Sequence, residues 1–267
     1  MTDAGPAPRL AFGLAAGVRT WLPELGEALA ALGYDEAWSN DVPGASGLET
    51  LAGLGSRAPD LRLAVGVLAL SDSTPAEIAS LVAASRLGAD RLTVGVGTGS
   101  GRSLARTREG VAAVRALLPE HLIGLAAVGP RMAALGGEVA DVVLLNWAGP
   151  RLAGERRAAI AAAAAEAGRP APRVAAYVRV AVGPGAAHRL ATEQDRYHGY
   201  GGSYRSVIDE QSARGEAPVG IAGEAEDVEA ALGAYRSALD TVAVRGLPAE
   251  DTLEAWLAVA EAAIVGS

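Results

Sequence analysis

Residues 61–70 read LRLAVGVLAL, a run in which Arg62 is the single charged residue. A strand with one wet face alternates apolar and polar residues, whereas a near-continuous apolar run is typical of a strand buried on both faces, as in a parallel sheet. A helix start follows, with a capping Thr74, a proline at the first helical position and Glu77 in the first turn. This stretch therefore predicts a buried parallel strand that leads into a helix.

The same alternation of short β-rich runs and longer runs of helical period continues in both directions along the chain. The predicted strands are residues 9–16, 34–39, 61–70, 91–96, 122–128, 141–146, 174–182 and 240–244. The predicted helices include residues 20–32, 48–57, 103–118, 130–139, 150–167 and 252–264, with another from Thr74 and a mostly helical stretch after residue 182. Eight strand–helix units in 267 residues predict an α/β protein with the closed (β/α)8 TIM barrel, whose usual size is about 250 residues.

The competing architecture is an open, doubly wound sheet, which has fewer strands and a reversal of strand order. No linker or compositional break divides the chain, so residues 1–267 are predicted to form a single barrel domain. The connection between the fourth and fifth strands is short, at about 25 residues.

The composition excludes several kinds of catalytic chemistry. All 23 basic residues are arginine, and a chain without lysine forms no Schiff base and builds no P-loop. A chain without cysteine has no thiolate nucleophile, iron–sulfur cluster or sulfur-ligated zinc. The spacing of the three histidines, His121, His188 and His198, does not suggest a metal site. A formal charge of −8 argues against nucleic acid as the main partner, because phosphate binding needs a basic surface.

The sequence also lacks the signals of membrane and exported proteins. No run of 18 apolar residues is present, which argues against a membrane span. The first ten residues, MTDAGPAPRL, contain an aspartate and two prolines where a signal peptide has its basic segment and apolar core. A soluble cytoplasmic protein is therefore expected.

In a TIM barrel the active site lies at the C-terminal ends of the strands, so the segments that follow each strand are the candidates. After the fourth strand, Gly97, Thr98 and Gly99 begin a glycine-rich loop that runs to Gly101. Such a loop ahead of a helix lets backbone amides approach an anion, or it is a plain turn. Residues 129–131 (GPR) form a second anion-compatible corner at a helix start, with Arg131 expected in solvent.

Polar side chains near other strand ends are candidates for acid–base work. Asn40 and Asp41 follow the second strand and offer an amide and a carboxyl group, or they cap the loop before Pro43. On the seventh strand, Tyr177 and Arg179 alternate with apolar residues. Because alternate residues of a strand face opposite sides, either these two or their neighbours point into the barrel.

Aromatic residues make up only 4% of the chain, yet residues 197–204 read YHGYGGSY. This cluster, which contains His198, is either a lid over the substrate or a glycine-rich surface loop. Trp147, directly after the sixth strand, either stacks on a planar ligand or packs on the barrel rim.

Five blocks of the sequence resemble the bacterial luciferase-like superfamily, the barrel flavoproteins that include coenzyme F420-dependent oxidoreductases. The blocks are residues 32–41 (LGYDEAWSND), 61–68 (LRLAVGVL), 88–99 (GADRLTVGVGTG), 126–132 (AAVGPRM) and 137–147 (GEVADVVLLNW). They follow the family's order and spacing, and residues 219–244 resemble its closing helix–strand unit.

The resemblance implies a flavin or deazaflavin that lies across the mouth of the barrel. Members of the family often have a non-proline cis peptide at the end of the third strand, against the central ring, which falls here around residues 66–70. Gly66 and Val67 are expected under the ring. The cofactor phosphate is expected against residues 97–99 and against Val128, Gly129 and Pro130. The ring system carries the hydride chemistry, and the protein supplies position and polarity.

Two departures from the family pattern concern catalysis. The family's Asp-His after the second strand is Asp41-Val42 here, which removes a common general acid. Its Arg-His-Pro before the third helix is residues 73–75 (STP), which removes a cation near the cofactor. Acid–base work then falls to Asp41, His198 or Tyr177, with Asn40 near the reacting face.

The short connection after the fourth strand resembles the deazaflavin-dependent branch. The leading hypothesis is therefore an F420-dependent oxidoreductase that transfers a hydride between the cofactor and a small organic substrate, as a homodimer like many family members. One alternative is an FMN-dependent monooxygenase. Another is a degenerate barrel, without turnover, that binds a ligand or a partner subunit.

Overall fold

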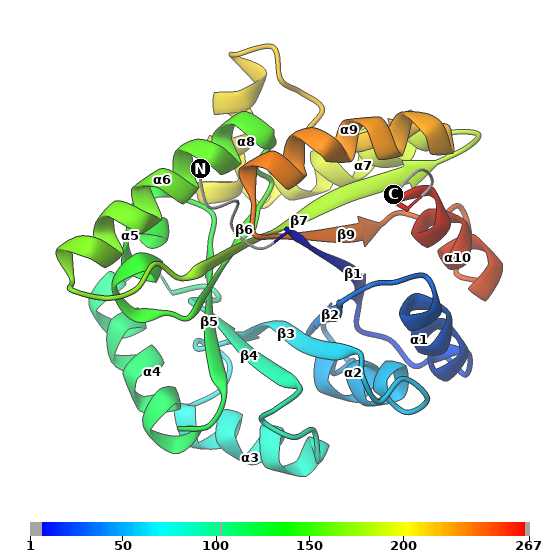
Figure 1. The fold of residues 1–267 in the computed structure, drawn as a ribbon. Helices are drawn as coiled ribbons and strands as arrows, with labels where there is room; N and C mark the ends of the chain where they lie inside the picture. The colour runs from blue at the N-terminus through cyan, green and yellow to red at the C-terminus, as the bar shows by residue number, and fades with distance from the viewer. Residues whose placement is uncertain (1–6, 102, 265–267) are drawn as a thin grey trace, which may run out of the picture.

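The computed structural model describes residues 7–101 and 103–264 and shows a closed parallel barrel surrounded by helices (Figure 1). The strands are β1 (Arg9–Ala15), β2 (Glu36–Asn40), β3 (Arg62–Ala69), β4 (Leu92–Gly97), β5 (Leu122–Ala127), β6 (Val142–Asn146), β7 (Arg173–Val182), β8 (Ile221–Gly223) and β9 (Thr241–Gly246). The strand order β6-β5-β4-β3-β2-β1-β9-β7 closes through a further pairing of β6 with β7, and every pairing is parallel. The predicted (β/α)8 barrel is confirmed.

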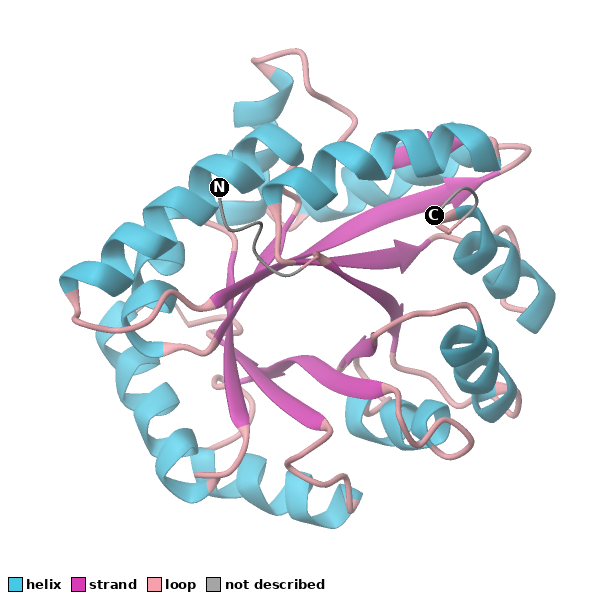
Figure 2. Cartoon of the chain, in the orientation of Figure 1, coloured by secondary structure: helices cyan, strands magenta, loops and turns pink. Residues whose placement is uncertain are grey.

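The helices cover the outside of the barrel, as the cyan ribbons around the magenta strands show (Figure 2). They are α1 (Leu22–Ala31), α2 (Gly47–Gly55), α3 (Pro75–Ser85), α4 (Leu104–Leu117), α5 (Pro130–Val139), α6 (Pro150–Glu166), α7 (Ala186–Gly199), α8 (Gly202–Ser212), α9 (Ala225–Ala238) and α10 (Leu253–Ala262). Among the described helices, none combines the length and the apolar character that crossing a membrane requires.

The predicted elements agree with the observed ones to within one to three residues at their ends, and α5 has the predicted bounds. The sequence analysis missed β8, a three-residue strand that pairs with residues 180–182 of β7 outside the barrel. A three-residue segment carries too little periodicity to identify it. The last predicted strand also ended at residue 244, whereas β9 continues to Gly246 and includes Arg245.

The core has an inner and an outer part. The inner part fills the barrel, with four alanines contributed by β1, β3, β7 and β9 around three larger side chains, Trp38, Leu144 and Tyr177. The rings of Trp38 and Tyr177 meet edge to face, with centroids 6.0 Å apart. The outer part, between strands and helices, is mostly aliphatic, with a few aromatic residues such as Phe12 and Trp256. The barrel is therefore packed through its centre, as TIM barrels are, and is not a pore.

A buried ionic cluster closes the N-terminal end of the barrel. The Glu36 carboxylate, 2% exposed, accepts hydrogen bonds from Arg9 Nη1 and Trp38 Nε1, both at 2.8 Å, and from Arg173 Nη1. Burial alone would raise the pKa of Glu36, but the charge of Arg173 and these hydrogen bonds outweigh it and hold the pKa below its ordinary 4.5. None of these four side chains has a buried nitrogen or oxygen atom without a hydrogen-bond partner, so the cluster needs no ligand.

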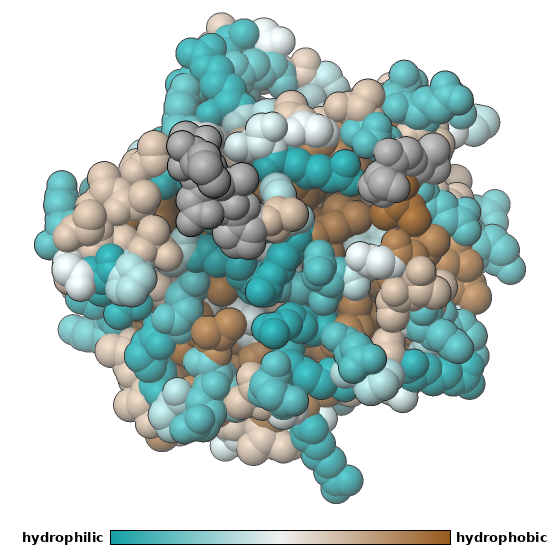
Figure 3. All heavy atoms as spheres, viewed as in Figure 1, coloured by the Kyte–Doolittle hydropathy of each residue, from teal (hydrophilic) through white to brown (hydrophobic). Residues whose placement is uncertain are grey.

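Hydrophilic residues lie over the centre and around the rim of the face seen in the space-filling view (Figure 3). Hydrophobic residues show between them in smaller areas. In the described part of the chain, the large hydrophobic residues that remain exposed are scattered, with Val18 the most exposed at 95%. Single exposed apolar residues are normal on a protein surface.

Candidate active site

The C-terminal half of β3 departs from regular strand geometry. Its register against β4 shifts between Val65 and Leu68, and the peptide bond between Gly66 and Val67 is cis. This is the segment in which the resemblance placed a cis peptide. The shift directs the Gly66–Val67 peptide toward the inner core of the barrel, where the Val67 side chain packs.

Gly66 lies in a position that only glycine fits without a shift. A Cβ atom there would lie 2.8 Å from Leu144 Cδ2, 3.0 Å from Trp38 Cε3 and 3.1 Å from the Tyr177 hydroxyl. The same Tyr177 hydroxyl donates a hydrogen bond to the Gly66 carbonyl oxygen at 3.1 Å, across the barrel from β7 to β3. Of the two orientations considered for the seventh strand, Tyr177 therefore faces the interior.

Tyr177 acts here as a donor. Burial raises its pKa to about 12, although the positive charges of Arg245 and Arg179 lower it. The phenol stays protonated at neutral pH, and its proton lies on the hydrogen bond to Gly66. Tyr177 is consequently suited to hold the β3 backbone and unsuited to act as a base.

Glycines of β4 make room for the irregular part of β3. A Cβ atom at Gly97 would lie 2.7 Å from Val67 Cγ2, and one at Gly95 would collide with the Val65 carbonyl oxygen. These two glycines, 95 and 97, thus have a packing role beyond the turn that the sequence indicated for the second of them.

The loop after β4 is fastened to the loop after β3. Gly99 has φ +60°, and any side chain there would collide with the Ser71 hydroxyl. Ser71 Oγ accepts the Ser100 amide at 3.2 Å and donates to the Asp72 carboxylate at 2.6 Å. One amide of the predicted anion loop is therefore already bonded, and Asp72 adds a negative charge beside it. The Ser100 amide is therefore not free to bind an anion, and the predicted anion contacts of this loop are left to residues 97–99.

The second predicted anion corner is more open. Gly129 is the N-cap of α5 without a side-chain capping bond, and Pro130 occupies the first turn. A Cβ at Gly129 would have Ser203 Oγ, at 4.0 Å, as its nearest neighbour, so the amide end of α5 faces free space beside the start of α8. Val128 is half-buried and Arg131 is exposed, as expected. Ser203 is a neighbour that sequence reasoning did not single out.

Asn40 and Asp41 lie together at the end of β2. Asp41 Oδ1 accepts the Gly47 amide at 2.6 Å, and Asn40 Nδ2 donates to the Asp41 carbonyl oxygen at 2.9 Å. The loop-capping interpretation of Asn40 and Asp41 is thus seen in the structure. Asp41 Oδ2, which does not accept the Gly47 amide, is left to bond a ligand. Burial raises the pKa of Asp41, the Gly47 hydrogen bond lowers it, and the charge of Glu49 raises it again, with a net increase.

His198 does not join this group. Its Nε2 atom pairs with Asp209 Oδ1 at 2.8 Å, which connects α7 to α8, and the two side chains are 38% and 60% exposed. The three tyrosines around it pack on one another instead, with Tyr197 in edge contact with Tyr200 and Tyr204. The structure therefore separates the histidine from the aromatic cluster.

The aromatic cluster covers a buried arginine. Arg179, 2% exposed, lies between the rings of Trp147, 4.2 Å from its centroid, and Tyr197, at 4.9 Å, and donates to Asn146 Oδ1. Burial lowers the pKa of Arg179. Trp147 packs on the barrel rim, the interpretation that sequence reasoning favoured. Segments after β6 and β7, more than 40 residues apart, thus form one structure.

Arg245 is a site residue that the sequence analysis missed. It is paired in register with Arg179 on β7, is 7% exposed and lies 5.4 Å from the centroid of the Tyr177 ring. The predicted strand stopped one residue before it, because an arginine usually marks the end of a buried run. An arginine inside the apolar segment TVAVRG was the available signal.

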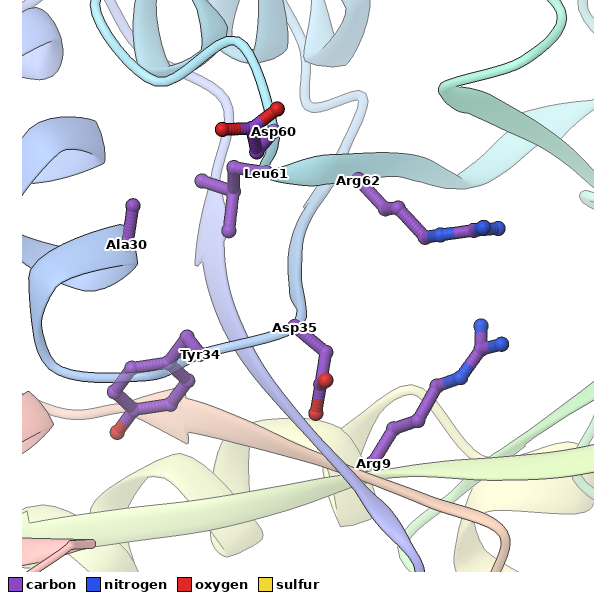
Figure 4. Close-up of a pocket in the computed structure, with 7 residues that line it drawn as sticks. All are labelled: Arg9, Ala30, Tyr34, Asp35, Asp60, Leu61 and Arg62. Atoms are coloured by element: carbon purple, nitrogen blue, oxygen red, sulfur yellow. The ribbon is translucent and has the colours of Figure 1, made fainter. Parts of the chain in front are cut away.

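Two cavities lie at opposite ends of the barrel. Figure 4 shows one, of about 310 Å³, where Arg9 and Arg62 extend toward the same open space near Asp35. Because Arg9 and Arg62 begin their strands, this cavity is at the N-terminal end. The other, of about 450 Å³, lies at the ends of β1 and β9 beneath α7 and includes Arg245. Only the second is on the face where TIM barrels place their active sites.

Comparisons with known proteins agree with this arrangement. The sequence profile of the luciferase-like monooxygenase family matches residues 116–242, slightly less than half of the chain. Among solved structures, coenzyme F420-dependent tetrahydromethanopterin reductase from Methanopyrus kandleri superposes with a TM-score of 0.73 at 17% identity, covering 97% of this chain and 99% of that chain. The resemblance to the luciferase-like superfamily is confirmed.

Two further solved structures share this barrel fold. An F420-dependent secondary alcohol dehydrogenase has a TM-score of 0.75 at 14% identity, covering 97% and 99% of the two chains. The oxygenating constituent of 3,6-diketocamphane monooxygenase from Pseudomonas putida, in complex with FMN, has a TM-score of 0.67 at 14% identity, covering 96% of each chain. At these identities the likeness shows the fold. A search of curated proteins found no match.

The chain departs from the pattern of the family that it resembles ahead of α3, and the structure shows what replaces it. Thr74 Oγ1 accepts the Glu77 amide at 3.3 Å, and the Glu77 carboxylate accepts the Thr74 amide at 2.6 Å, which forms a capping box. The hydrogen bonds that the Thr74 amide and the Thr74 hydroxyl donate to this carboxylate lower the pKa of Glu77. Residues 73–75 therefore begin a helix and supply no cation to the mouth of the barrel.

Proposed function

We propose that this chain is an oxidoreductase that binds a flavin or deazaflavin across the C-terminal mouth of the barrel, with F420 as the preferred cofactor. In this proposal a hydride passes between the cofactor and a small organic substrate. The observation that carries it is the hydrogen bond between Tyr177 and the Gly66 carbonyl oxygen, which holds an irregular β3 backbone against the interior at the catalytic end. A planar ring needs such a rigid support.

The residues present fit a cofactor of this kind. Gly129 offers the open N-terminus of α5 to a phosphate, with Ser203 Oγ nearby as a donor. Residues 97–99 offer a second set of backbone contacts, whereas Asp72 keeps the anion away from Ser100. When bound, the cofactor supplies the hydride chemistry. The protein binds and orients the cofactor and the substrate, and it delivers protons to the substrate.

Within this proposal Tyr177 is a positioning residue, since its proton is engaged by Gly66. Asp41 is the candidate proton donor to the substrate, because its raised pKa favours the protonated carboxyl more than in a free aspartate. The Asn40 amide, at the end of the same strand, is placed to hydrogen-bond a substrate oxygen. His198 stays a candidate only if α7 and α8 rearrange, because Asp209 holds it.

The preference for F420 is supported by the short connection between β4 and β5, residues 98–121, and by two of the similar structures named above. The alternative, an FMN-dependent monooxygenase, is favoured by the family profile that matches residues 116–242. A barrel without turnover is favoured by Val42 and by the capping box at Thr74, which occupy the places of two catalytic side chains in the family.

Parallel titrations of the purified chain with F420 and FMN, followed by cofactor fluorescence, test the proposal. We expect micromolar or tighter binding of F420 and weaker binding of FMN. The variant Gly66→Ala should bind at least tenfold more weakly, because the added methyl group displaces Tyr177 and Trp38. Gly233→Ala, on α9 in open space, is the matched control and should bind normally.

Preferential binding of FMN with oxygen-dependent product formation would establish the monooxygenase alternative instead. If neither cofactor binds at micromolar concentration, the proposal is wrong and the barrel acts without a flavin.

A further inference from the structure

Two arginines lie side by side at the catalytic end without a bonded carboxylate in the part of the chain that the structure describes. Arg179 and Arg245 are register partners on β7 and β9, and they are 2% and 7% exposed. A negative charge nearby, that of Glu193, is engaged by Arg196 through hydrogen bonds of 2.7 and 2.9 Å. Two buried like charges repel each other, so an anion bound beside them would be stabilised by both.

Donor groups of both arginines are free. Arg179 Nε and Arg245 Nη1 are buried and have no hydrogen-bond partner among the described residues. Arg179 is otherwise committed, since it donates to Asn146 and lies between the rings of Trp147 and Tyr197. Arg245 forms no hydrogen bond from its guanidinium to any described residue. It is therefore the arginine that is available to a ligand.

Arg245 also lines the cavity of about 450 Å³ at the ends of β1 and β9. The α7 side contributes the Thr192 hydroxyl group and the ion pair of Arg196 with Glu193, so Arg245, unlike Arg196, is a cation of this lining that the Glu193 carboxylate does not engage. Trp256 and Leu247 contribute apolar surface. Such a cavity fits a molecule with an anionic oxygen group at one end and a small apolar body.

The cavity is connected to the proposed cofactor site through one side chain. The Arg245 guanidinium lies 5.4 Å from the Tyr177 ring centroid, and the hydroxyl of that same tyrosine holds the Gly66 carbonyl oxygen. A molecule anchored at Arg245 thus lies next to the residue that supports the irregular β3 backbone.

We propose that Arg245, supported by the positive charge of Arg179, binds an oxyanion group of the substrate, a carboxylate or a phosphate ester. The assignment of this anion to the substrate rests on the proposed function. The anion site itself does not, because it follows from the unpaired cations and the cavity.

Calorimetric titration of the purified chain with inorganic phosphate and, separately, with acetate tests the site at low ionic strength. We expect millimolar or tighter binding of at least one anion, and the stronger one identifies the group. Arg245→Gln should weaken that binding at least tenfold, whereas Arg245→Lys should retain part of it because the charge is kept. Arg62→Gln, at the cavity on the opposite end (Figure 4), is the control and should change binding less than twofold.

The inference is overturned if neither anion binds the unmodified chain, or if Arg245→Gln binds it as tightly. Phosphate held at the Gly129 corner would survive Arg245→Gln, so the two sites are distinguishable. Anion binding that depends on Arg245, in a chain that binds neither F420 nor FMN, would support this site and refute the proposed function. The reverse pattern would support the proposed function and refute this site.

Discussion

The two ends of the barrel differ in whether their arginines are paired with a carboxylate. At the N-terminal end, Arg9 and Arg173 share the buried Glu36 carboxylate, which also accepts the Trp38 indole hydrogen. At the C-terminal end, Arg179 and Arg245 are more deeply buried than Arg9 and Arg173, yet no described carboxylate bonds to either. The first cluster is satisfied by the chain alone, and the second is not.

This difference separates structural from functional charge. Burying an ion requires a partner of opposite charge, and a protein whose own residues supply one uses the cluster to hold the fold. Where the chain supplies none, we infer that a ligand does. The end that lacks a counter-charge is also the end at which TIM barrels carry their active sites.

The largest expected effect is at the satisfied end. Glu36→Gln leaves Arg9 and Arg173 as unpaired neighbouring cations and should lower the free energy of unfolding by about 3 kcal/mol. Urea denaturation measures this. Arg57→Gln, which breaks an exposed pair with Glu24, should change stability by less than about 1 kcal/mol. Equal losses in the two variants would show that burial does not decide the effect.

A somewhat smaller effect is expected where β3 meets the interior. Gly66→Ala adds a methyl group within 2.8 Å of Leu144 and should destabilise the protein by about 2 kcal/mol through overpacking. Gly233→Ala, in the middle of α9 with no atom near the added group, should stabilise it by about 0.5–1 kcal/mol. The same denaturation experiment compares them, and a Gly66→Ala variant as stable as the unmodified chain would contradict the packing described.

Tyr177→Phe should have an effect of about 1–2 kcal/mol on stability, because it leaves the buried Gly66 carbonyl oxygen without its donor. Tyr34→Phe removes an equally buried hydrogen bond, 2.8 Å long, to the Ala260 carbonyl oxygen. We expect similar losses of stability in the two variants, but weaker cofactor binding only in Tyr177→Phe. Weaker binding in both would show that general loosening is responsible.

The pH dependence of stability should be smaller and should arise at the N-terminal end. The pKa of Glu36 is lower in the folded chain than its ordinary 4.5, so its contribution is complete above that pH and is lost as the pH falls through the folded pKa. The stability difference between the unmodified chain and Glu36→Gln should therefore be constant near neutral pH and shrink below pH 4.5. A difference that grows in acid would contradict the ionic cluster.

The smallest effect should follow removal of charge at the unsatisfied end. Arg245→Met deletes a buried cation that has no bonded counter-charge and keeps most of the side-chain volume, so stability should change by less than about 1 kcal/mol. Measured beside Glu36→Gln, it compares the two ends directly. A loss as large as that of Glu36→Gln would mean that Arg245 serves the fold.

Much of the fold could be predicted from local patterns in the sequence. Residues 61–70 were identified as a strand because their apolar run needs burial on both faces. The start of α3 was identified from the capping Thr74, the proline after it and Glu77 in the first turn. Gly129 and Pro130 marked the start of α5 for similar reasons. Such signals depend on neighbours within a few residues, which is why they can be read from the sequence.

The candidate site could be predicted from the sequence only in part. The irregular segment at Gly66 and Val67 was expected from the resemblance, yet its support by Tyr177 was not, because the two partners are 111 residues apart. Arg245 was missed because its proposed role depends on its having no bonded carboxylate among the described residues. An unpaired charge is recognised only when every possible partner can be located.

The sequence by itself determined the order of elements, the strand faces that must be buried and the absence of lysine and cysteine chemistry. Only the tertiary structure decided that Tyr177 faces inward, that His198 is held by Asp209 and that Arg179 and Arg245 lie together. The physical reason is that periodicity and capping are short-range properties of the chain. The closure of the barrel, by contrast, joins strands distant in sequence and decides which charges find a partner.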